Sequence, residues 1–481
     1  MRSVEIAIIG AGPAGLAATA EAVGYGAKVT LIDDNRQPGG QYFRQISREF
    51  RRTSMTVFDK EQARAEELLR IATHPAVDYL PETTVWSLSD DRIVAFSGPR
   101  GSGRLAAGCL ILCTGAHDQP VPFPGWTLPG VITAGGLQNL LKEQRMLPGR
   151  RAVVAGNGPL LLVAAASLLR GGAHLAEVVE AAPIHRRLLP LLPSLTASPT
   201  ILRLAIAYRA LMMRHGVPLS TGETVIEALG EESLRALRVA PIGEDGRVVR
   251  DRARTIEADI LITGFGLRAS SELCHILGCR LAHLGQRGGW LPQRNDDLET
   301  SCANILAAGD GAAIGGVEFA MLEGALAGLV AARRLGRSGG VEQREREAVL
   351  RGRLARMERF RHGLESLYRP PADYLQLITP QTLICRCEEV TAAALSSPCA
   401  GSALALKGAT RIGMGRCQGR FCHATLAALI AARDGYPVEA VQLPRLRPPA
   451  RLVRIGELLA EEVPDAVLPS NPHLPRGEKI G

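Results

Sequence analysis

Residues 4–15 read Val-Glu-Ile-Ala-Ile-Ile-Gly-Ala-Gly-Pro-Ala-Gly and decide the fold of the first part of the chain. The β-branched run at 4–9 predicts a buried strand, and the alanine-rich run that continues to about Tyr25 predicts a helix. A second strand over 28–32 ends at Asp33, whose carboxylate we expect to accept a hydrogen bond from a ribose hydroxyl. This order of elements predicts a dinucleotide-binding unit in which the helix N-terminus faces the phosphates. The turn residues expected to bind the cofactor are Gly10, Gly12, Pro13, Ala14 and Gly15.

Three further stretches resemble motifs of flavoproteins that contain two dinucleotide domains. A strand that ends in Gly309-Asp310 resembles the motif whose aspartate contacts the ribityl and pyrophosphate region of FAD. Gly39-Gly40-Gln41 resembles the loop near the isoalloxazine, and residues 110–115 resemble the strand that returns toward the cofactor. The resemblance implies FAD at the first unit. The implied contacts outside the glycine turn are Asp33, Gly40, Gln41, Val85, Thr114, Gly115, Gly309 and Asp310.

Residues 151–180 repeat the pattern of strand, glycine turn, helix and strand, and the second strand ends at Glu180. Leu161 replaces the third glycine of the turn, and we expect it to push the helix from the strand and loosen a pyrophosphate site. Glu180 favours the unphosphorylated ribose of NAD over that of NADP. The second unit therefore either holds NAD or ATP, or it is a degenerate domain kept for architecture.

Length and composition limit the classes of protein to which the chain can belong. A chain of 481 residues predicts two to four domains. The net charge of +8 is the difference between 56 basic and 48 acidic residues. Only five of the basic residues are lysines, and the basic residues are spread along the chain. This pattern indicates arginine-rich codon usage rather than a nucleic-acid-binding patch. Glycines interrupt the apolar start and the apolar run at 152–169, so we expect no transmembrane segment and a soluble, cytoplasmic protein.

No catalytic residue can be assigned from the sequence. His117 follows a Cys-Thr-Gly-Ala turn, where it is either an acid–base group near a flavin or a structural histidine. Cys274 and Cys279 have four residues between them, so they do not form the Cys-x-x-Cys of a disulfide oxidoreductase. Six scattered cysteines are predicted to be buried structural thiols, namely Cys109, Cys113, Cys274, Cys279, Cys302 and Cys399.

The remaining four cysteines lie in a separate C-terminal module. An amphipathic helix over 341–368 and prolines at 370, 371 and 380 lead into it. Cys385, Cys387, Cys417 and Cys422 form a Cys-x-Cys and a Cys-x4-Cys pair, and four thiolates can hold zinc or an iron–sulfur cluster. Cys-x-Cys is tight for structural zinc and resembles the [2Fe–2S] domain of bacterioferritin-associated ferredoxin, whose second pair is Cys-x2-Cys. Zinc and a purely structural site remain as alternatives.

The whole arrangement resembles the α (A or B) subunit of heteromeric dye-linked amino-acid dehydrogenases, which include D-hydroxyproline dehydrogenase, opine oxidases and hydrogen cyanide synthase. The stretches that carry the resemblance are 39–44, 122–131, 156–162 and 413–420. The resemblance implies a D-amino-acid-oxidase-like β subunit that oxidises the C–N bond, often with a small ferredoxin-like γ subunit. It also implies FMN as a candidate at the α–β interface. FAD and the cluster in this chain would then relay electrons to an acceptor such as a quinone, with peripheral membrane contact through that acceptor.

The expected fold class is α/β, with two Rossmann-like domains, the second inserted in the first, and a small, mainly helical [2Fe–2S] domain. We assign 1–120 and 290–340 to the FAD-binding first unit and 121–289 to the degenerate second unit. A linker helix is expected over 341–380, and the cysteine module with its tail over 381–481. Three other functions stay open, namely a hydrogen cyanide synthase subunit, a stand-alone NADH-dependent flavin reductase and a mainly structural subunit.

Overall fold

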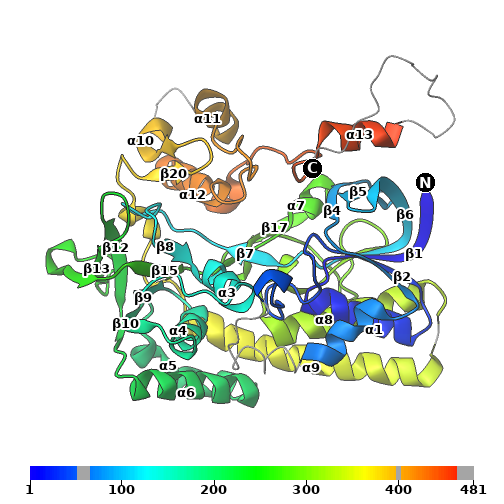
Figure 1. Ribbon diagram of the computed structural model, residues 1–481, viewed down its shortest axis with the longest axis horizontal. Helices are drawn as coiled ribbons and strands as arrows, with labels where there is room; N and C mark the ends of the chain where they lie inside the picture. The colour runs from blue at the N-terminus through cyan, green and yellow to red at the C-terminus, as the bar shows by residue number, and fades with distance from the viewer. Residues whose placement is uncertain (51–64, 338, 397–401, 463–481) are drawn as a thin grey trace.

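A parallel sheet forms the centre of the first unit in the computed structural model, which describes residues 1–50, 65–337, 339–396 and 402–462 (Figure 1). Its parallel strands lie in the order β3-β2-β1-β6-β19, and an antiparallel pair, β5 and β4, extends it beside the first half of β6. The strands are β1 (Arg2–Ile9), β2 (Val29–Ile32), β3 (Val77–Leu80), β4 (Thr84–Leu88), β5 (Ile93–Gly98), β6 (Gly101–Leu112) and β19 (Ile305–Ala307). Cys399 lies outside the described residues.

Helices α1 (Pro13–Gly24) and α8 (Val317–Arg334) lie against each other beside this sheet (Figure 1). Their backbones approach closely because α8 has glycines where it crosses α1. A Cβ atom at Gly324 would lie 2.0 Å from the carbonyl oxygen of Ala14, and one at Gly328 would lie 2.1 Å from that of Ala18. The turn before α1 and the start of α8 are thereby held side by side.

The second sheet lies between β6 and β19 in the sequence, so the second unit is inserted in the first, as expected. It is parallel throughout, in the order β11-β10-β9-β15-β8. Its strands are β8 (Val131–Thr133), β9 (Arg151–Gly156), β10 (His174–Glu180), β11 (Leu219–Thr221) and β15 (Ile260–Gly264). An antiparallel sheet, β12 (Glu223–Leu229), β13 (Ala236–Pro241) and β14 (Arg254–Glu257), packs beside it. The helices of the second unit are α3 (Ala134–Lys142), α4 (Leu160–Arg170), α5 (Ile184–Leu195) and α6 (Pro199–Arg214).

Two antiparallel strands link the units, because β7 (Ala116–Asp118) leaves the first and β16 (Leu267–Ala269) returns to it. Helix α7 (Glu272–Ile276) and the hairpin of β17 (Leu281–Leu284) and β18 (Gly289–Pro292) follow. Leu273, Cys274, Leu277 and Cys279 pack in one core with strands of the first sheet. The chain therefore rejoins the core of the first unit before residue 290, where the sequence placed the boundary.

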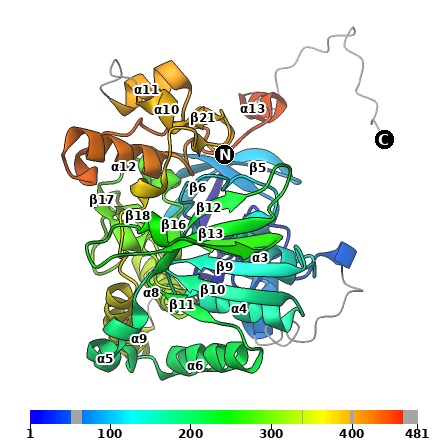
Figure 2. The same cartoon turned by 90° about the vertical axis from the view of Figure 1, so that its left-hand side faces the viewer.

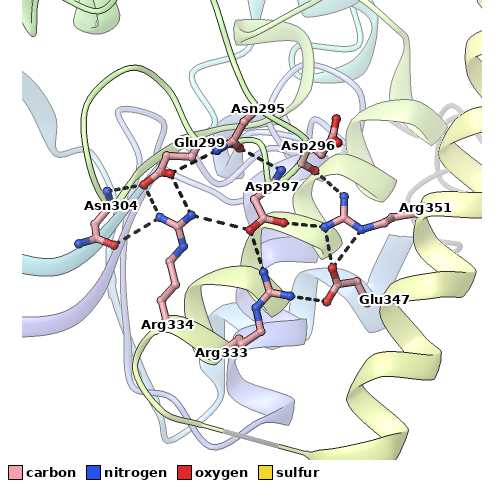
Figure 3. A network of polar contacts seen from close by, with 9 residues as sticks. All are labelled: Asn295, Asp296, Asp297, Glu299, Asn304, Arg333, Arg334, Glu347 and Arg351. Carbon is pink, nitrogen blue, oxygen red and sulfur yellow. Dashed lines mark hydrogen bonds and ion pairs between the residues drawn. The ribbon is translucent and has the colours of Figure 1, made fainter.

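The long helix α9 (Gly340–Leu367) contacts α8 of the first unit and α5 of the second (Figures 1 and 2). The apolar stripe expected from the sequence packs inward, with Leu350, Met357 and Phe360 buried. An ion-pair network joins α8 and α9 to the loop that precedes β19 (Figure 3). In it, Asp297 pairs with Arg333 at 2.8 Å and with Arg351 at 2.6 Å.

The cysteine module has a core of its own above the two units (Figure 1). Its elements are β20 (Leu383–Cys385), β21 (Val390–Thr391), α10 (Ala392–Leu395), α11 (Ala403–Thr410) and α12 (His423–Asp434), followed by α13 (Ile455–Glu462). Over the described ranges, no helix has both the length and the apolar composition that crossing a bilayer requires.

Candidate functional site

The glycine turn of the first unit has a geometry that only glycine permits. Gly10 has a φ of +103°, and a Cβ atom there would lie 2.2 Å from the carbonyl oxygen of Cys113. At Gly15 a Cβ would lie 1.8 Å from the carbonyl oxygen of Gly10. Gly12 precedes α1, which starts at Pro13. The turn therefore brings the helix N-terminus, with its free amides, to the carboxyl end of β1, where a pyrophosphate binds in such units.

Asp33, which follows β2, is buried and braces this turn. One carboxylate oxygen accepts a hydrogen bond from the backbone amide of Ala11, and the other accepts bonds from the Asn35 amide (2.7 Å) and Asn35 Nδ2 (2.8 Å). Burial raises the pKa of Asp33, and the amides of Asn35 and Ala11 oppose that rise. The oxygen bonded to Ala11 retains a lone pair, so the carboxylate can also accept a bond from a ribose hydroxyl.

The loop with Gly39, Gly40 and Gln41 folds back over the glycine turn. The Gly39 amide donates to the carbonyl oxygen of Ala11 at 2.8 Å, and a Cβ atom at Gly40 would lie 2.8 Å from Cα of Gly12. Gln41 is exposed. Two chain segments therefore meet at Gly12 without side chains between them, which leaves backbone amides facing the expected pyrophosphate position.

Val85 lies two residues after a segment that is bonded to Asp33. It is a buried residue of β4, and the amide of Thr83 just before it donates to the carbonyl oxygen of Asp33 at 2.8 Å. Val85 thus follows the segment bonded to Asp33, and its contact with the cofactor stays a prediction.

The remaining expected FAD contacts also converge on the turn. Thr114 and Gly115 follow β6, and a Cβ atom at Gly311 would lie 2.5 Å from Oγ1 of Thr114. Gly309 follows β19, where a Cβ would lie 2.7 Å from Cβ of Ala14. Asp310 accepts the amides of residues 315 and 316 just before α8, and burial raises its pKa. Stretches some 300 residues apart in the sequence thus lie together around the glycine turn. We call the segments 10–15, 33–41, 114–115 and 309–310 the FAD cradle.

Glu323 supports this cradle and was missed by the sequence reasoning. It is 3% exposed within α8, and its Oε2 accepts the backbone amide of Gly309 at 2.8 Å. Both carboxylate oxygens also accept bonds from Arg294, at 2.9 and 3.0 Å. A sequence signal did exist, because Glu323 is the single charged residue in the otherwise apolar run 319–332.

The second unit has the same order of strand, glycine turn and helix as the first, but other parts of the protein cover its turn. Leu161 is buried and lies directly over Gly264 of β15, where a Cβ would come within 2.8 Å of Cδ2 of Leu161. The helix α4 still packs on β9 and β15, because the missing side chain at Gly264 makes room for the leucine. This corrects the expectation that Leu161 displaces the helix.

Chain from the end of α9 covers the second glycine turn. Asn157, in the middle of the turn, donates from Nδ2 to the carbonyl oxygen of Tyr368 at 2.7 Å. Tyr374 packs in the core of the second unit, with its ring 5.0 Å from that of Phe265. Glu180 accepts the amides of Gly158 and Ala182, and burial raises its pKa to about 8. The turn that would hold a pyrophosphate thus contacts the protein's own backbone.

The four cysteines of the cysteine module come together from its two loops. Cys417 interacts with Cys387, and Cys422 interacts with both Cys385 and Cys417. All four are free thiols, and Cys385 and Cys422 are buried. A Cβ atom at Gly415 would lie 2.2 Å from Cβ of Cys387, so the second loop passes directly beside the first. The ranges that the structure describes hold no group of three or more histidine, cysteine or acidic side chains placed to hold a metal ion.

The loop between Cys417 and Cys422 docks on the first unit. Arg420 forms a 2.7 Å ion pair with Glu272 of α7, and both side chains are about 15% exposed, at 16% and 15%. Phe421 meets the ring of His117 edge to face, with centroids 5.4 Å apart. His117 is two residues beyond Gly115, and its Nε2 is buried without a partner. The cysteine loop therefore touches the strand that follows the Thr114–Gly115 turn.

The other cysteine loop docks on the second unit. Trp126 donates from Nε1 to the carbonyl oxygen of Leu383 at 2.9 Å, and the guanidinium of Arg386 lies 5.5 Å from the centre of the indole ring. Both contacts flank Cys385, so the first loop is held at each side.

Comparison with known proteins finds similarity along most of the chain. Residues 4–336 match the family model described as pyridine nucleotide-disulphide oxidoreductase. The A subunit of opine oxidase from Agrobacterium tumefaciens is 34% identical over 476 residues, covering 94% of this chain and 91% of that protein. The HcnB subunit of hydrogen cyanide synthase from Pseudomonas aeruginosa is 32% identical over 422 residues, covering 86% of this chain and 90% of that protein.

A solved structure shares the fold. L-Proline dehydrogenase from P. horikoshii superposes with a TM-score of 0.66, covering 95% of this chain and 79% of that chain at 20% identity. At that identity the similarity shows only that the two chains share the same fold.

Proposed function

The chain belongs to the pyridine nucleotide-disulphide oxidoreductase family, and from this premise we propose that it is the FAD- and [2Fe–2S]-containing α subunit of a heteromeric amino- or imino-acid dehydrogenase. A D-amino-acid-oxidase-like β subunit would oxidise the C–N bond of the substrate, and this chain would relay the electrons to an acceptor. The observation that carries the proposal is the docking of the Cys417–Cys422 loop on the strand after Thr114 and Gly115. It joins the expected FAD cradle to the cysteine loops without intervening chain.

The flavin part of the proposal rests on the family, whose members are flavoproteins, and on the shape of the first unit. The glycine turn would hold the pyrophosphate through the amides at the start of α1, and Asp33 would hold the adenosine ribose. Asp310 and the start of α8 would face the ribityl chain. When bound, FAD accepts two electrons and a [2Fe–2S] centre passes one at a time. The chain's own residues bind and orient these groups.

The cluster part rests on the nearness of the thiols from the two cysteine loops. A [2Fe–2S] centre is held by four cysteine thiolates. Cys417 interacts with Cys387, and Cys422 interacts with Cys385 and Cys417, so each loop offers thiols to the other. This nearness supports a binuclear cluster, with zinc and a purely structural site as the alternatives.

Substitution of Cys417 by serine tests the cluster. We expect the purified Cys417→Ser protein to lose near-visible absorption beyond that of the flavin and the EPR signal of the reduced state. The Cys302→Ser protein is the matched control, because Cys302 lies outside the cysteine module and should leave both signals intact. An unchanged spectrum in the Cys417→Ser protein would exclude the cluster.

The partners and the substrate class follow from the relatives. The opine oxidase and hydrogen cyanide synthase relatives are both described as subunits, so a multi-subunit enzyme is the natural assembly. We propose D-hydroxyproline- or opine-type compounds as donors, with a hydrogen cyanide synthase subunit as the alternative function. We further propose a ferredoxin-like γ subunit, FMN at the α–β interface and a quinone-type acceptor. Every cysteine in the described ranges is a free thiol, which supports a reducing, cytoplasmic location.

The second glycine turn argues against an NADH-dependent reductase. Asn157 already donates to Tyr368, and Leu161 fills the place of the third glycine. Mixing the purified chain with NADH in the absence of oxygen should leave the flavin absorption unchanged. Rapid bleaching by NADH would instead favour the reductase.

Co-purification tests the assembly itself. The chain, expressed with the products of its neighbouring genes, should purify as a heteromer that reduces a dye with one of D-amino acids, proline derivatives, opines or glycine. Full activity of the isolated chain on such a substrate would refute the α-subunit proposal. A heteromer without dye reduction on any of them would refute the substrate class alone.

A further inference from the structure

Three thiols that the sequence assigned to separate packing positions meet beside α7. Cys274 belongs to α7, Cys279 follows it, and Cys302 comes from the loop before β19. The sulfur atoms of Cys279 and Cys302 are 3.6 Å apart. Cys274 and Cys279 are 3% and 5% exposed, whereas Cys302 is partly exposed, so the group reaches the surface at Cys302.

Cys279 is the central thiol and is set up to be the anion. Hydrogen bonding with the Cys274 thiol is the largest influence and, with smaller contributions from Thr300 and Cys302, it lowers the pKa of Cys279 despite its burial. The pKa of Cys302 is raised to about 11, by burial and by the neighbouring Cys279. Cys279 is therefore more readily deprotonated than Cys302, and their sulfur atoms lie close together, which is the arrangement of a reactive cysteine with a resolving partner.

We propose that Cys279 and Cys302 are a thiol pair that closes to a disulfide when the protein meets a hydroperoxide. The Cys279 sulfur attacks one peroxide oxygen, the O–O bond breaks, and water or an alcohol leaves as Cys279 becomes a sulfenic acid. The Cys302 sulfur then attacks the Cys279 sulfur, the S–S bond forms, the S–O bond breaks, and a second water leaves with the Cys302 proton. The two thiols lose two electrons, and the peroxide gains them.

Cys302 rather than Cys274 is the resolving partner because of where each lies. Cys274 is fully packed, and its carbonyl oxygen accepts the Cys279 amide at 3.0 Å in the turn that ends α7. Cys302 belongs to a separate surface loop whose Glu299 and Asn304 are bonded to Arg334 of α8. A Cys279–Cys302 bond therefore crosslinks the α7 segment to the loop that leads into β19.

Peptide mapping tests the pair, and its outcome does not depend on the proposed electron relay. The purified FAD-loaded protein is treated with a small excess of hydrogen peroxide, its free thiols are blocked with N-ethylmaleimide, and the digest is analysed by mass spectrometry. We expect one major linked peptide that joins Cys279 to Cys302 and disappears on dithiothreitol treatment. Cys109 and Cys113, buried in the first unit, should be fully blocked only after denaturation and should remain thiols.

Two variants make the result decisive. Cys302→Ser should abolish the linked peptide and leave Cys279 as sulfenic or sulfinic acid, whereas Cys274→Ser should retain the Cys279–Cys302 peptide. A Cys274–Cys279 link in the native protein would overturn the pairing. Unmodified Cys279 after peroxide, with Cys302 alone oxidised, would overturn the reactive role of Cys279. Both readouts are independent of activity, and Cys302→Ser changes a side chain that is only partly buried.

Discussion

Phe421, one residue before Cys422, meets His117 edge to face with ring centroids 5.4 Å apart. The contact joins residues 304 positions apart in the sequence and places the cysteine module against the strand that follows Gly115. Electron transfer between two bound groups requires that the protein fix their separation. The His117–Phe421 contact and the neighbouring Arg420–Glu272 ion pair supply that constraint.

Reversing the charge of Arg420 should release the cysteine loop from the first unit. Arg420→Glu places two carboxylates together at a site where each side chain is largely buried, and losing such a pair costs about 2–5 kcal/mol. Hydrogen exchange of the amides at 114–118 should increase, while the flavin content stays unchanged. The double variant with Arg420→Glu and Glu272→Arg should restore protection. Arg433→Glu, on the surface of the same module, is the control and should have no effect.

Adding one methyl group at Gly15 should expel the flavin. A Cβ there would lie 1.8 Å from the Gly10 carbonyl oxygen, so the turn must shift, at a cost of about 1–3 kcal/mol. The affinity for FAD should fall by about tenfold or more. Gly24→Ala in the same helix is a matched control because nothing lies within 4 Å of its Cβ position. The ratio of flavin to protein absorbance after purification checks both variants, and equal ratios would contradict the expected crowding.

Neutralising Glu323 should weaken both the fold and the cradle. Glu323→Gln leaves Arg294 with a buried, uncompensated charge and leaves a single amide oxygen to accept from both Arg294 and the Gly309 amide, and we expect a loss of about 3–5 kcal/mol. Thermal unfolding of the apoprotein measures the first effect and FAD titration the second. Glu345→Gln, an exposed change on α9, should leave both unchanged.

The buried Glu180 should make stability fall as the pH rises. Its pKa is about 8 in the folded protein against 4.5 as the ordinary value, so between these limits the folded state holds a proton that the unfolded state has lost. Stability from this group is therefore complete below pH 4.5 and lost as the pH passes 8, with a slope of up to about 1.4 kcal/mol per pH unit. Glu180→Gln should remove this slope. The free energy of unfolding, measured with urea at several pH values, checks this prediction. The same pH dependence in both proteins would refute the assignment of the slope to Glu180.

Restoring the third glycine of the second turn should cost stability without creating a nucleotide site. Leu161 is 1% exposed and fills the space over Gly264, so Leu161→Gly should cost about 3–5 kcal/mol through cavity formation and glycine's poor helix propensity. The Tyr368 carbonyl oxygen would still bond to Asn157. Calorimetric titration with NADH should show no gain in binding over the original protein.

Local sequence patterns were sufficient to predict the α/β class and the two Rossmann-like sheets. At Gly10 and Gly15 each residue type meets a steric demand that acts within a few residues, so the pattern can be interpreted without the tertiary structure. The insertion of the second unit was predictable for the same reason, since its strand, turn and acid repeat in order. The roles of individual residues toward FAD and a cluster remain predictions.

Contacts between distant segments could not be predicted. No sequence feature near Asn157 indicates that Tyr368 lies over it. The fit of Leu161 depends on Gly264, which is 103 residues away. Glu323 shows an intermediate case, because an isolated charge in an apolar helix signals a buried partner without naming it. The meeting of Cys274, Cys279 and Cys302 depends on how α7 packs against the loop before β19.

The close crossing of α1 and α8 has a consequence for the order of assembly during synthesis. The helix that opens the cradle is made within the first 24 residues, but its partner begins at Val317, after the whole second unit has been synthesised. A nascent chain that ends before β19 lacks Gly309, Asp310 and the glycines that seat α8 on α1. The second unit, whose strands are contiguous in the sequence, can fold first. The flavin cradle therefore closes late, around an already folded insert.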